Sequence, residues 1–249
     1  MHTTDKASVT EVDADSSLDS QPPQPKPRPR RQLHGRRMGR AMKASQSMAL
    51  ASTLPAKRLD LDVSAPAPLS MLFSSPVNDV WLEIGFGGGE HLFWQAQNHP
   101  HVGFIGCEPF LTGVAKLLRD AQQAGLSNLR IHDDDARQVL EWLPEASIGR
   151  MFVLFPDPWP KKRHHKRRFL HASALDAIAR VMRPGAHLRF ATDIADYADM
   201  VLKGMAGRTD FASCPGLHAE RPADWPATRY EGKAIKAGRT CQFFSFERV

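Results

Sequence analysis

From residue 79 onward, short apolar runs alternate with segments in which apolar residues recur at helical spacing. The short runs predict strands at 80–84, 102–107, 129–132, 150–155, 186–191 and 241–246. Helices are predicted near 89–98, at 110–124, from 136, at 169–182 and at 194–206. The run at 150–155 is the most continuously apolar, which is typical of the central strand of a parallel sheet. This alternation predicts an α/β fold with an open, doubly wound, mostly parallel sheet.

The chain before residue 79 follows a different pattern. Residues 1–32 begin acidic and serine-rich and then alternate proline with lysine and arginine. Such a composition favours extended conformations without a core, so we expect a disordered tail there. Residues 33–78 are predicted to form a basic, partly helical N-terminal segment. Residues 79–249 then make up the α/β domain.

The composition excludes several classes of protein. The 249 residues are 42% hydrophobic, enough to bury a sizeable core, yet no stretch approaches the roughly 18 uncharged apolar residues of a membrane span. The three cysteines are widely spaced, which argues against a disulfide framework and against a CxxC metal site. The N-terminus has no apolar signal region, so we expect a cytoplasmic protein that does not associate with membranes.

The net charge of +6 is distributed unevenly along the chain. Residues 1–59 contain 11 Lys and Arg against 5 Asp and Glu, whereas the remainder is balanced. The balanced part still contains a basic run at 161–168, with six Lys or Arg in eight positions. Segregated positive charge indicates a polyanionic partner, although a single run of this kind is more often a solvated surface.

A glycine-rich turn follows the first predicted strand, with the pattern ExGxGxG from Glu83 through Gly85 and Gly87 to residue 89. Glycines between a strand and a helix allow the backbone to approach a ligand closely. A nicotinamide-binding fingerprint would need glycine at position 90, where this chain has Glu90. By itself the turn is compatible with a cofactor loop or with a tight turn.

Acidic residues follow the next two predicted strands. Glu108 comes directly after the second strand, where a carboxylate can accept both ribose hydroxyls of an adenosine. Three aspartates, 133–135, follow the third strand, and Asp135 is the best placed to accept the adenine amino group. We expect Asp133 and Asp134 to cap the following helix. These acids indicate an adenosine cofactor without specifying which one.

The loop after the central strand carries the most distinctive motif. Prolines on both sides of Asp157 and Trp159 stiffen this loop, and the basic run follows at once. Preorganised polar groups here are suited to a reacting centre, and cations behind them are suited to phosphates. His164 and His165 have no second pair of metal ligands at useful spacing, so no metal site is expected.

Two further motifs lie late in the chain. Asp193 follows the strand predicted at 186–191, and the sequence TRYEGK at 228–233 lies in a long connection before the last strand. Functional loops concentrate in connections of this kind. A carboxylate can accept the adjacent N1–H and N2–H of guanine, so these segments are candidates for contact with a base.

Over roughly residues 36–249, these motifs together resemble the bacterial tRNA (guanine-N7-)-methyltransferase family. The sequences PDPWPKKRHHKRR and TRYEGK carry the resemblance, and ExGxGxG is similar to the first motif of class I S-adenosylmethionine-dependent methyltransferases. The resemblance implies a seven-stranded Rossmann-like sheet and S-adenosyl-L-methionine as methyl donor. It also implies methylation of N7 of guanosine 46 in the tRNA variable loop, by a monomer or homodimer.

The resemblance also assigns roles to individual residues. The donor site comprises Glu83, Gly85, Gly87, Glu108, Asp135 and Asp157, and Asp157 is also the catalytic position. The substrate site comprises Lys161, Asp193, Thr228, Arg229, Tyr230 and Glu231. From the basic run, the expected RNA contacts are Arg163, His164, His165, Lys166, Arg167 and Arg168.

Two alternatives remain. An NAD-dependent oxidoreductase would use the same adenosine-binding acids, but Glu90 and the absence of a Tyr-Lys or His proton relay count against it. A non-enzymatic RNA-binding protein would explain the basic segments, but it has no use for acids placed after three successive strands.

Overall fold

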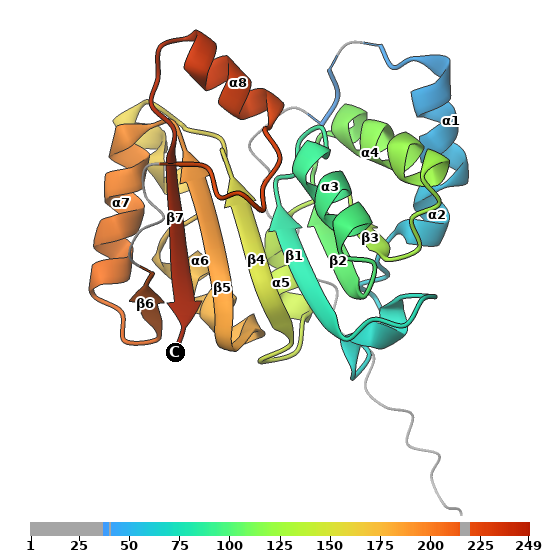
Figure 1. Cartoon of the computed structure of the whole chain (residues 1–249), viewed down its shortest axis with the longest axis horizontal. Helices are drawn as coiled ribbons and strands as arrows, with labels where there is room; N and C mark the ends of the chain where they lie inside the picture. The colour runs from blue at the N-terminus through green and yellow to red at the C-terminus, as the bar shows by residue number, and fades with distance from the viewer. Residues whose placement is uncertain (1–36, 40, 215–219) are drawn as a thin grey trace, which may run out of the picture.

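The computed structural model describes residues 37–39, 41–214 and 220–249. One sheet of seven strands runs through the molecule in the order β3-β2-β1-β4-β5-β7-β6 (Figure 1). Its strands are β1 (Asp79–Ile84), β2 (Val102–Cys107), β3 (Leu129–His132), β4 (Ile148–Leu154), β5 (Met182–Thr192), β6 (Phe211–Ser213) and β7 (Gln242–Arg248). The first five are parallel, and β7 is antiparallel to both β5 and β6. The predicted α/β architecture is thereby confirmed.

Helices cover both faces of this sheet. They are α1 (Ala44–Ser52), α2 (Leu54–Lys57), η1 (Leu69–Leu72), α3 (Glu90–Asn98), α4 (Leu111–Gln123), α5 (Ala136–Trp142), η2 (Lys162–Arg167), α6 (Ala172–Val181), α7 (Ala195–Ala206) and α8 (Arg229–Lys236). One core cluster joins α1, α3 and α4 to one face, and a second joins α5, α6 and α7 to the other. In Figure 1, α8 lies above the carboxyl edge of the sheet.

The apolar spacing explains these placements. In α4 the buried residues Val114, Leu117, Leu118 and Ala121 recur at helical intervals and form one face. Strand β4 is central, and its inner residues 151–153 are almost completely buried. The position predicted for this strand from its continuous apolar run is confirmed.

Within residues 79–249, three of the described elements were not recognised from the sequence pattern. Strand β6 has three residues, of which only Phe211 is buried, so it has too little apolar alternation to be recognised. Helix α8 lies within the segment predicted to be a long connection, and η2 lies within the basic run. Strand β5 begins at Met182, earlier than the predicted residue 186, and its pairing with β4 shifts register between Ile148 and Arg150.

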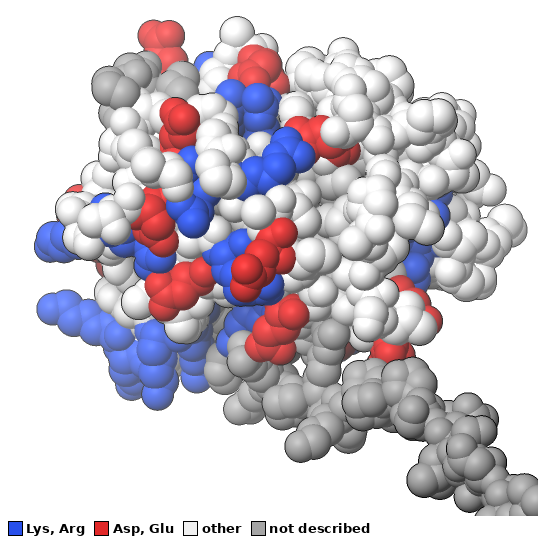
Figure 2. All heavy atoms as spheres, turned by 90° about the horizontal axis from the view of Figure 1, so that it is seen from below, with Lys and Arg blue, Asp and Glu red and all other residues white. Residues whose placement is uncertain are grey.

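The face at the amino ends of the parallel strands carries basic and acidic side chains that intermingle, with a basic group at one margin (Figure 2). Ion pairs toward this end of the sheet include Arg183 with Asp79 and Arg208 with both Asp176 and Asp210. Many of its charges are therefore already matched within the chain. Among the described residues, no helix has the length and apolarity needed to cross a membrane.

Candidate active site

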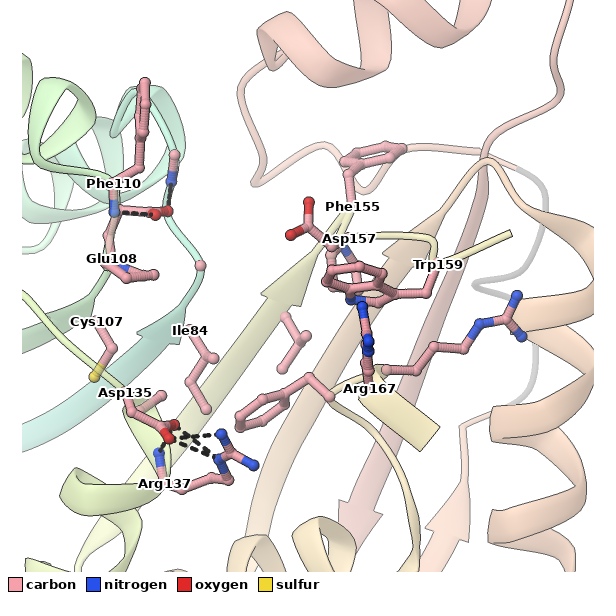
Figure 3. Close-up of a pocket in the computed structure, with 18 of the residues that line it drawn as sticks. Ile84, Cys107, Glu108, Phe110, Asp135, Arg137, Phe155, Asp157, Trp159 and Arg167 are labelled. Atoms are coloured by element: carbon pink, nitrogen blue, oxygen red, sulfur yellow. Dashed lines mark hydrogen bonds and ion pairs between the residues drawn. The ribbon is translucent and has the colours of Figure 1, made fainter. Parts of the chain in front are cut away.

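A cavity of about 530 Å³ opens at the carboxyl ends of β1 to β4 (Figure 3). Its volume is within the range typical of small-molecule sites, roughly 300–1,000 Å³. Parallel sheets bind ligands at this edge because the loops that follow neighbouring strands converge there. The predicted site residues that line it are Gly85, Gly87, Glu108, Asp135, Asp157, Lys166, Arg167, Arg168 and Tyr230.

The glycine loop, residues 85–89, connects β1 to α3. Gly85, Gly87 and Gly89 all have positive φ values, a region that other residues rarely adopt. At Gly87 a Cβ atom would lie only 2.8 Å from the ring of Tyr230, so a side chain there would also require this exposed ring to shift. Helix α8 therefore packs against the glycine loop through Tyr230.

Glu108 follows β2 and is 8% exposed. Its two carboxylate oxygens accept hydrogen bonds from the backbone N–H groups of Gly87, at 2.7 Å, and Phe110, at 2.9 Å. Burial raises the pKa of this carboxyl, and the two backbone N–H groups partly offset that effect. Each oxygen keeps a further lone pair, so the carboxylate can still accept two hydroxyl groups of a ligand.

Asp135 follows β3 and is the N-cap of α5, where its side chain accepts the backbone N–H of Arg137 at 3.0 Å. The Arg137 guanidinium also binds both of its carboxylate oxygens (Figure 3). The prediction that Asp133 and Asp134 cap this helix is wrong, because Asp135 is the residue directly before its first turn. Asp133 and Asp134 instead form ion pairs with Arg58 and Arg37.

Glu83 belongs to β1, but it is not among the residues that line the cavity. Its carboxylate lies 2.7 Å from Nδ1 of His91 on α3, and both side chains are almost fully buried. The other ring nitrogen of His91 is 3.2 Å from the Gln95 amide, which donates to the Asp224 carbonyl. Glu83 therefore holds α3 behind the glycine loop, and the structure does not place it in the cavity.

Asp157 lies in the loop after β4, defined here as residues 155–160 and called the Asp157 loop. Figure 3 shows its carboxylate pointing into the cavity from the side opposite Glu108. Partial desolvation by the surrounding walls raises the pKa of the Asp157 carboxyl. Phe155 and Trp159 both have positive φ values, so the backbone is constrained on either side of Asp157.

The basic run divides into an outer and an inner group. Lys161, Lys162, Arg163 and Lys166 are exposed. The Arg167 guanidinium lies over the Trp159 ring, 5.0 Å from its centre, and Figure 3 shows both residues beside the cavity.

Arg168 is 1% exposed and donates to the Pro158 carbonyl and to Asp196. Its guanidinium is buried and engaged by these acceptors, which argues against the predicted contact with RNA. The two histidines of the run are half-buried: His165 is 3.4 Å from Asp196, and the His164 ring lies 6.0 Å from the Trp159 ring.

The two motifs late in the chain, Asp193 and the segment 228–233, also combine exposed residues with residues that are paired inside the protein. Thr228 and Glu231 form a reciprocal capping box at the start of α8, and Glu231 also pairs with Arg221. Tyr230 and Arg229 are exposed, and only Tyr230 is among the residues that line the cavity. The Asp193 carboxylate binds Arg239 at 2.6 Å. Asp193 and Lys161 are likewise not among the residues that line the cavity.

Phe110 and Arg137 are among the lining residues that were not singled out from the sequence. Phe110 precedes α4 and supplies one of the N–H groups bound to Glu108. Arg137 stands two residues after the capping Asp135, a spacing that suits a local carboxylate–guanidinium pair. This spacing was the sequence signal from which Arg137 could have been predicted at the site.

The residues present fit an adenosyl methyl donor. A carboxylate with free acceptor capacity follows β2, a glycine loop permits close approach after β1, and a carboxylate follows β3. Within the described parts of the chain, no group of three or more His, Cys, Asp or Glu is arranged to hold a metal ion.

Comparison with known proteins places these features in context. Residues 77–243 match a family model described as "Putative methyltransferase". The tRNA (guanine-N(7)-)-methyltransferase of Mesorhizobium japonicum is 48% identical over 217 residues, which cover 86% of this chain and 93% of the relative. The protein of the same name from Chelativorans sp. is 44% identical over 218 residues, with 86% and 94% coverage.

Solved structures with low sequence identity support the fold alone. The 16S rRNA methyltransferase KamB superposes with a TM-score of 0.56 at 19% identity, covering 75% of this chain and 95% of that one. TrmN from Thermus thermophilus superposes with a TM-score of 0.51 at 16% identity, covering 82% and 52% respectively. These two structures thus share the α/β fold described above.

Proposed function

The chain belongs to the tRNA (guanine-N(7)-)-methyltransferase family, and from this premise we propose that it transfers a methyl group from S-adenosyl-L-methionine to N7 of a guanosine in tRNA, forming 7-methylguanosine. The observation that carries the proposal is the position of Asp157 opposite Glu108 across one cavity, with basic side chains beside it. By resemblance to the family, the guanosine is number 46 of the variable loop.

On the donor side, Glu108 accepts the ribose hydroxyls through the lone pairs that Gly87 and Phe110 leave free. The glycine loop accommodates the methionine part of the donor, because it presents backbone without side chains. Asp135 serves the adenine while it is held in place by Arg137.

The bound donor supplies an electrophilic methyl group on a sulfonium. Guanine N7 carries a lone pair and no proton, so the chain needs no general base to activate the nucleophile. Its residues instead hold N7 in line with the methyl group, which lowers the barrier through orientation. The methyl–sulfur bond would break as the N7–methyl bond forms, so S-adenosylhomocysteine would leave and the positive charge would pass from sulfur to the guanine ring. Asp157 stabilises that charge from its position in the cavity wall.

On the RNA side, the exposed members of the basic run bind phosphates next to the target guanosine. Arg163 and Lys166 are the best candidates, because both are exposed on η2, the short helix that follows the Asp157 loop. Tyr230 contacts the guanosine from α8, and Arg229 beside it contacts the RNA backbone. We propose tRNA as the partner. The protein would bind it in the cytoplasm, and it would act as a monomer or homodimer.

The decisive experiment is mass spectrometry of nucleosides from tRNA incubated with the protein and S-adenosylmethionine. The proposal requires that 7-methylguanosine appears with the active protein and falls sharply with Asp157→Ala. A different methylated nucleoside, or none, would contradict it. Calorimetry with S-adenosylhomocysteine and with NAD then identifies the cofactor directly, and only the first should bind.

A further inference from the structure

Arg168 joins two loops at the carboxyl edge of the sheet. Its Nε donates to the carbonyl of Pro158, next to Asp157, at 2.9 Å. Its two terminal nitrogens donate to Asp196, in the first turn of α7, at 3.2 Å to the carbonyl and 2.8 Å to the carboxylate. The guanidinium also lies 4.8 Å from the centre of the buried Tyr197 ring. One side chain thus connects the loop after β4 to the segment after β5.

The Asp157 loop needs such an anchor. Three of the five residues 156–160 are prolines, which have no N–H to donate. Phe155 and Trp159 both have positive φ values, which are unfavourable for residues with a side chain. Strained backbone of this kind persists only where surrounding contacts hold it. The bond from Arg168 to Pro158 is a contact of that kind, made from a fully buried side chain.

An arginine is suited to this role in a way that a lysine is not. The planar guanidinium presents its donors in a fixed fork, so it can bind the carbonyl on one side and the carboxylate on the other. The neighbouring Arg167 stacks on Trp159, which lies in the same loop. The inner members of the basic run therefore contact the loop, while the outer members face solvent.

We propose that Arg168 is a positioning residue for methyl transfer, which fixes Asp157 by tying the loop after β4 to the start of α7. This inference rests on the proposed function, because it takes Asp157 to act at the methyl acceptor. It separates the basic run into two roles: the outer cations contact RNA, and Arg168 holds the reacting geometry without touching RNA.

The test is Arg168→Lys in the full chain, assayed in single turnover with saturating tRNA and saturating donor. Misplacement of Asp157 should lower the methyl-transfer rate by about tenfold or more. S-adenosylhomocysteine affinity and the salt dependence of tRNA binding should both stay unchanged. An arginine that merely contributed to stability would leave the saturated rate intact, so this rate separates the two roles.

Arg208→Lys is the matched control. Arg208 also forms a multiple ion pair, with Asp176 and Asp210, but it lies at the other end of α7. It should lower the thermal unfolding temperature without changing the saturated rate. Asp196→Asn is the second variant, because Asp196 is exposed and the change is tolerated more easily. It should lower the rate in the same direction as Arg168→Lys but by less.

Two results would overturn the inference. One is a full saturated rate in Arg168→Lys or, if that variant does not fold, in Asp196→Asn. The other is a salt slope reduced by about 0.7–0.9 in the uncharged variant Arg168→Gln, the value for one lost phosphate contact. Failure of the proposed function is distinguishable from both, because the unmodified protein would then form no 7-methylguanosine.

Discussion

The carboxylate of Glu108 lies 2.7 Å from the backbone nitrogen of Gly87, so the end of β2 is hydrogen-bonded to the glycine loop after β1. The acid that is expected to bind the ribose therefore also fixes the loop that accommodates the rest of the donor. Burial raises the pKa of this carboxyl, whereas the N–H groups of Gly87 and Phe110 favour its charged form. One side chain thus joins two parts of the expected donor site.

We expect Glu108→Gln to weaken S-adenosylhomocysteine binding at least tenfold. Loss of a charged acceptor for hydroxyl groups typically costs about 1.5–3 kcal/mol, and the amide would also face the N–H of Gly87 with a donor. Isothermal titration calorimetry measures the affinity directly. An unchanged dissociation constant would remove Glu108 from the donor site.

The raised pKa of Glu108 also predicts how donor binding depends on pH. Ribose hydroxyls donate to the charged carboxylate, so affinity should rise with pH through the folded-state pKa, which lies above the ordinary 4.5. The free energy of unfolding responds in the opposite direction. The neutral carboxyl of Glu108 contributes fully to stability below the pKa that this group has in the unfolded chain. That contribution is lost as the pH rises through the higher pKa of the group in the folded protein. Titrations between about pH 4 and 7 should show this dependence in the wild-type protein and lose it in Glu108→Gln.

Most of the framework could be predicted from the sequence, because its signals are local. Apolar runs identified the parallel strands, and their order along the chain placed Glu108, Asp135 and Asp157 at one edge. The side-chain contacts of Glu83 and Arg168 could not be predicted. Glu83 is paired with His91 across a strand–helix contact, and Arg168 turns inward within a run of charges that otherwise face solvent. Both depend on which way a side chain points in the folded molecule.

Glu83→Ala should therefore affect stability more than donor binding. Removing one partner of a buried pair leaves His91 without its carboxylate, and such changes cost about 3–5 kcal/mol in free energy of unfolding. Urea denaturation measures this loss, with calorimetry under native conditions for donor affinity. Glu90→Ala is the control, because Glu90 pairs with Lys116 near the surface and should cost no more than about 1 kcal/mol. A large loss of affinity in folded Glu83→Ala, with little loss of stability, would return Glu83 to the donor site.

Asp157→Asn tests whether the charge of Asp157 matters beyond its shape. Asparagine keeps the size of the side chain but cannot stabilise the positive charge that develops on guanine, so single-turnover methylation should fall by about tenfold or more. The affinity for tRNA should stay close to wild type. Partial desolvation raises the pKa of this carboxyl, so the wild-type rate should fall as the pH is lowered through that pKa. An Asn variant with full activity would leave Asp157 only a positioning role.

The exposed cations of the basic run should determine the salt dependence of tRNA binding. Arg163 and Lys166 are exposed on η2, the short helix that follows the Asp157 loop, so their partners should be phosphates flanking the target guanosine. Each phosphate contact contributes about 0.7 on single strands and 0.9 on duplexes to the slope of log affinity against log salt. Replacing both residues with alanine should thus flatten the slope by about 1.4–1.8 in a binding series, with donor affinity unchanged.

Arg168 is excluded from this set because its guanidinium is buried against Pro158 and Asp196. If the double variant keeps the full slope, the outer cations are a solvated surface and the RNA-binding face lies elsewhere on the molecule.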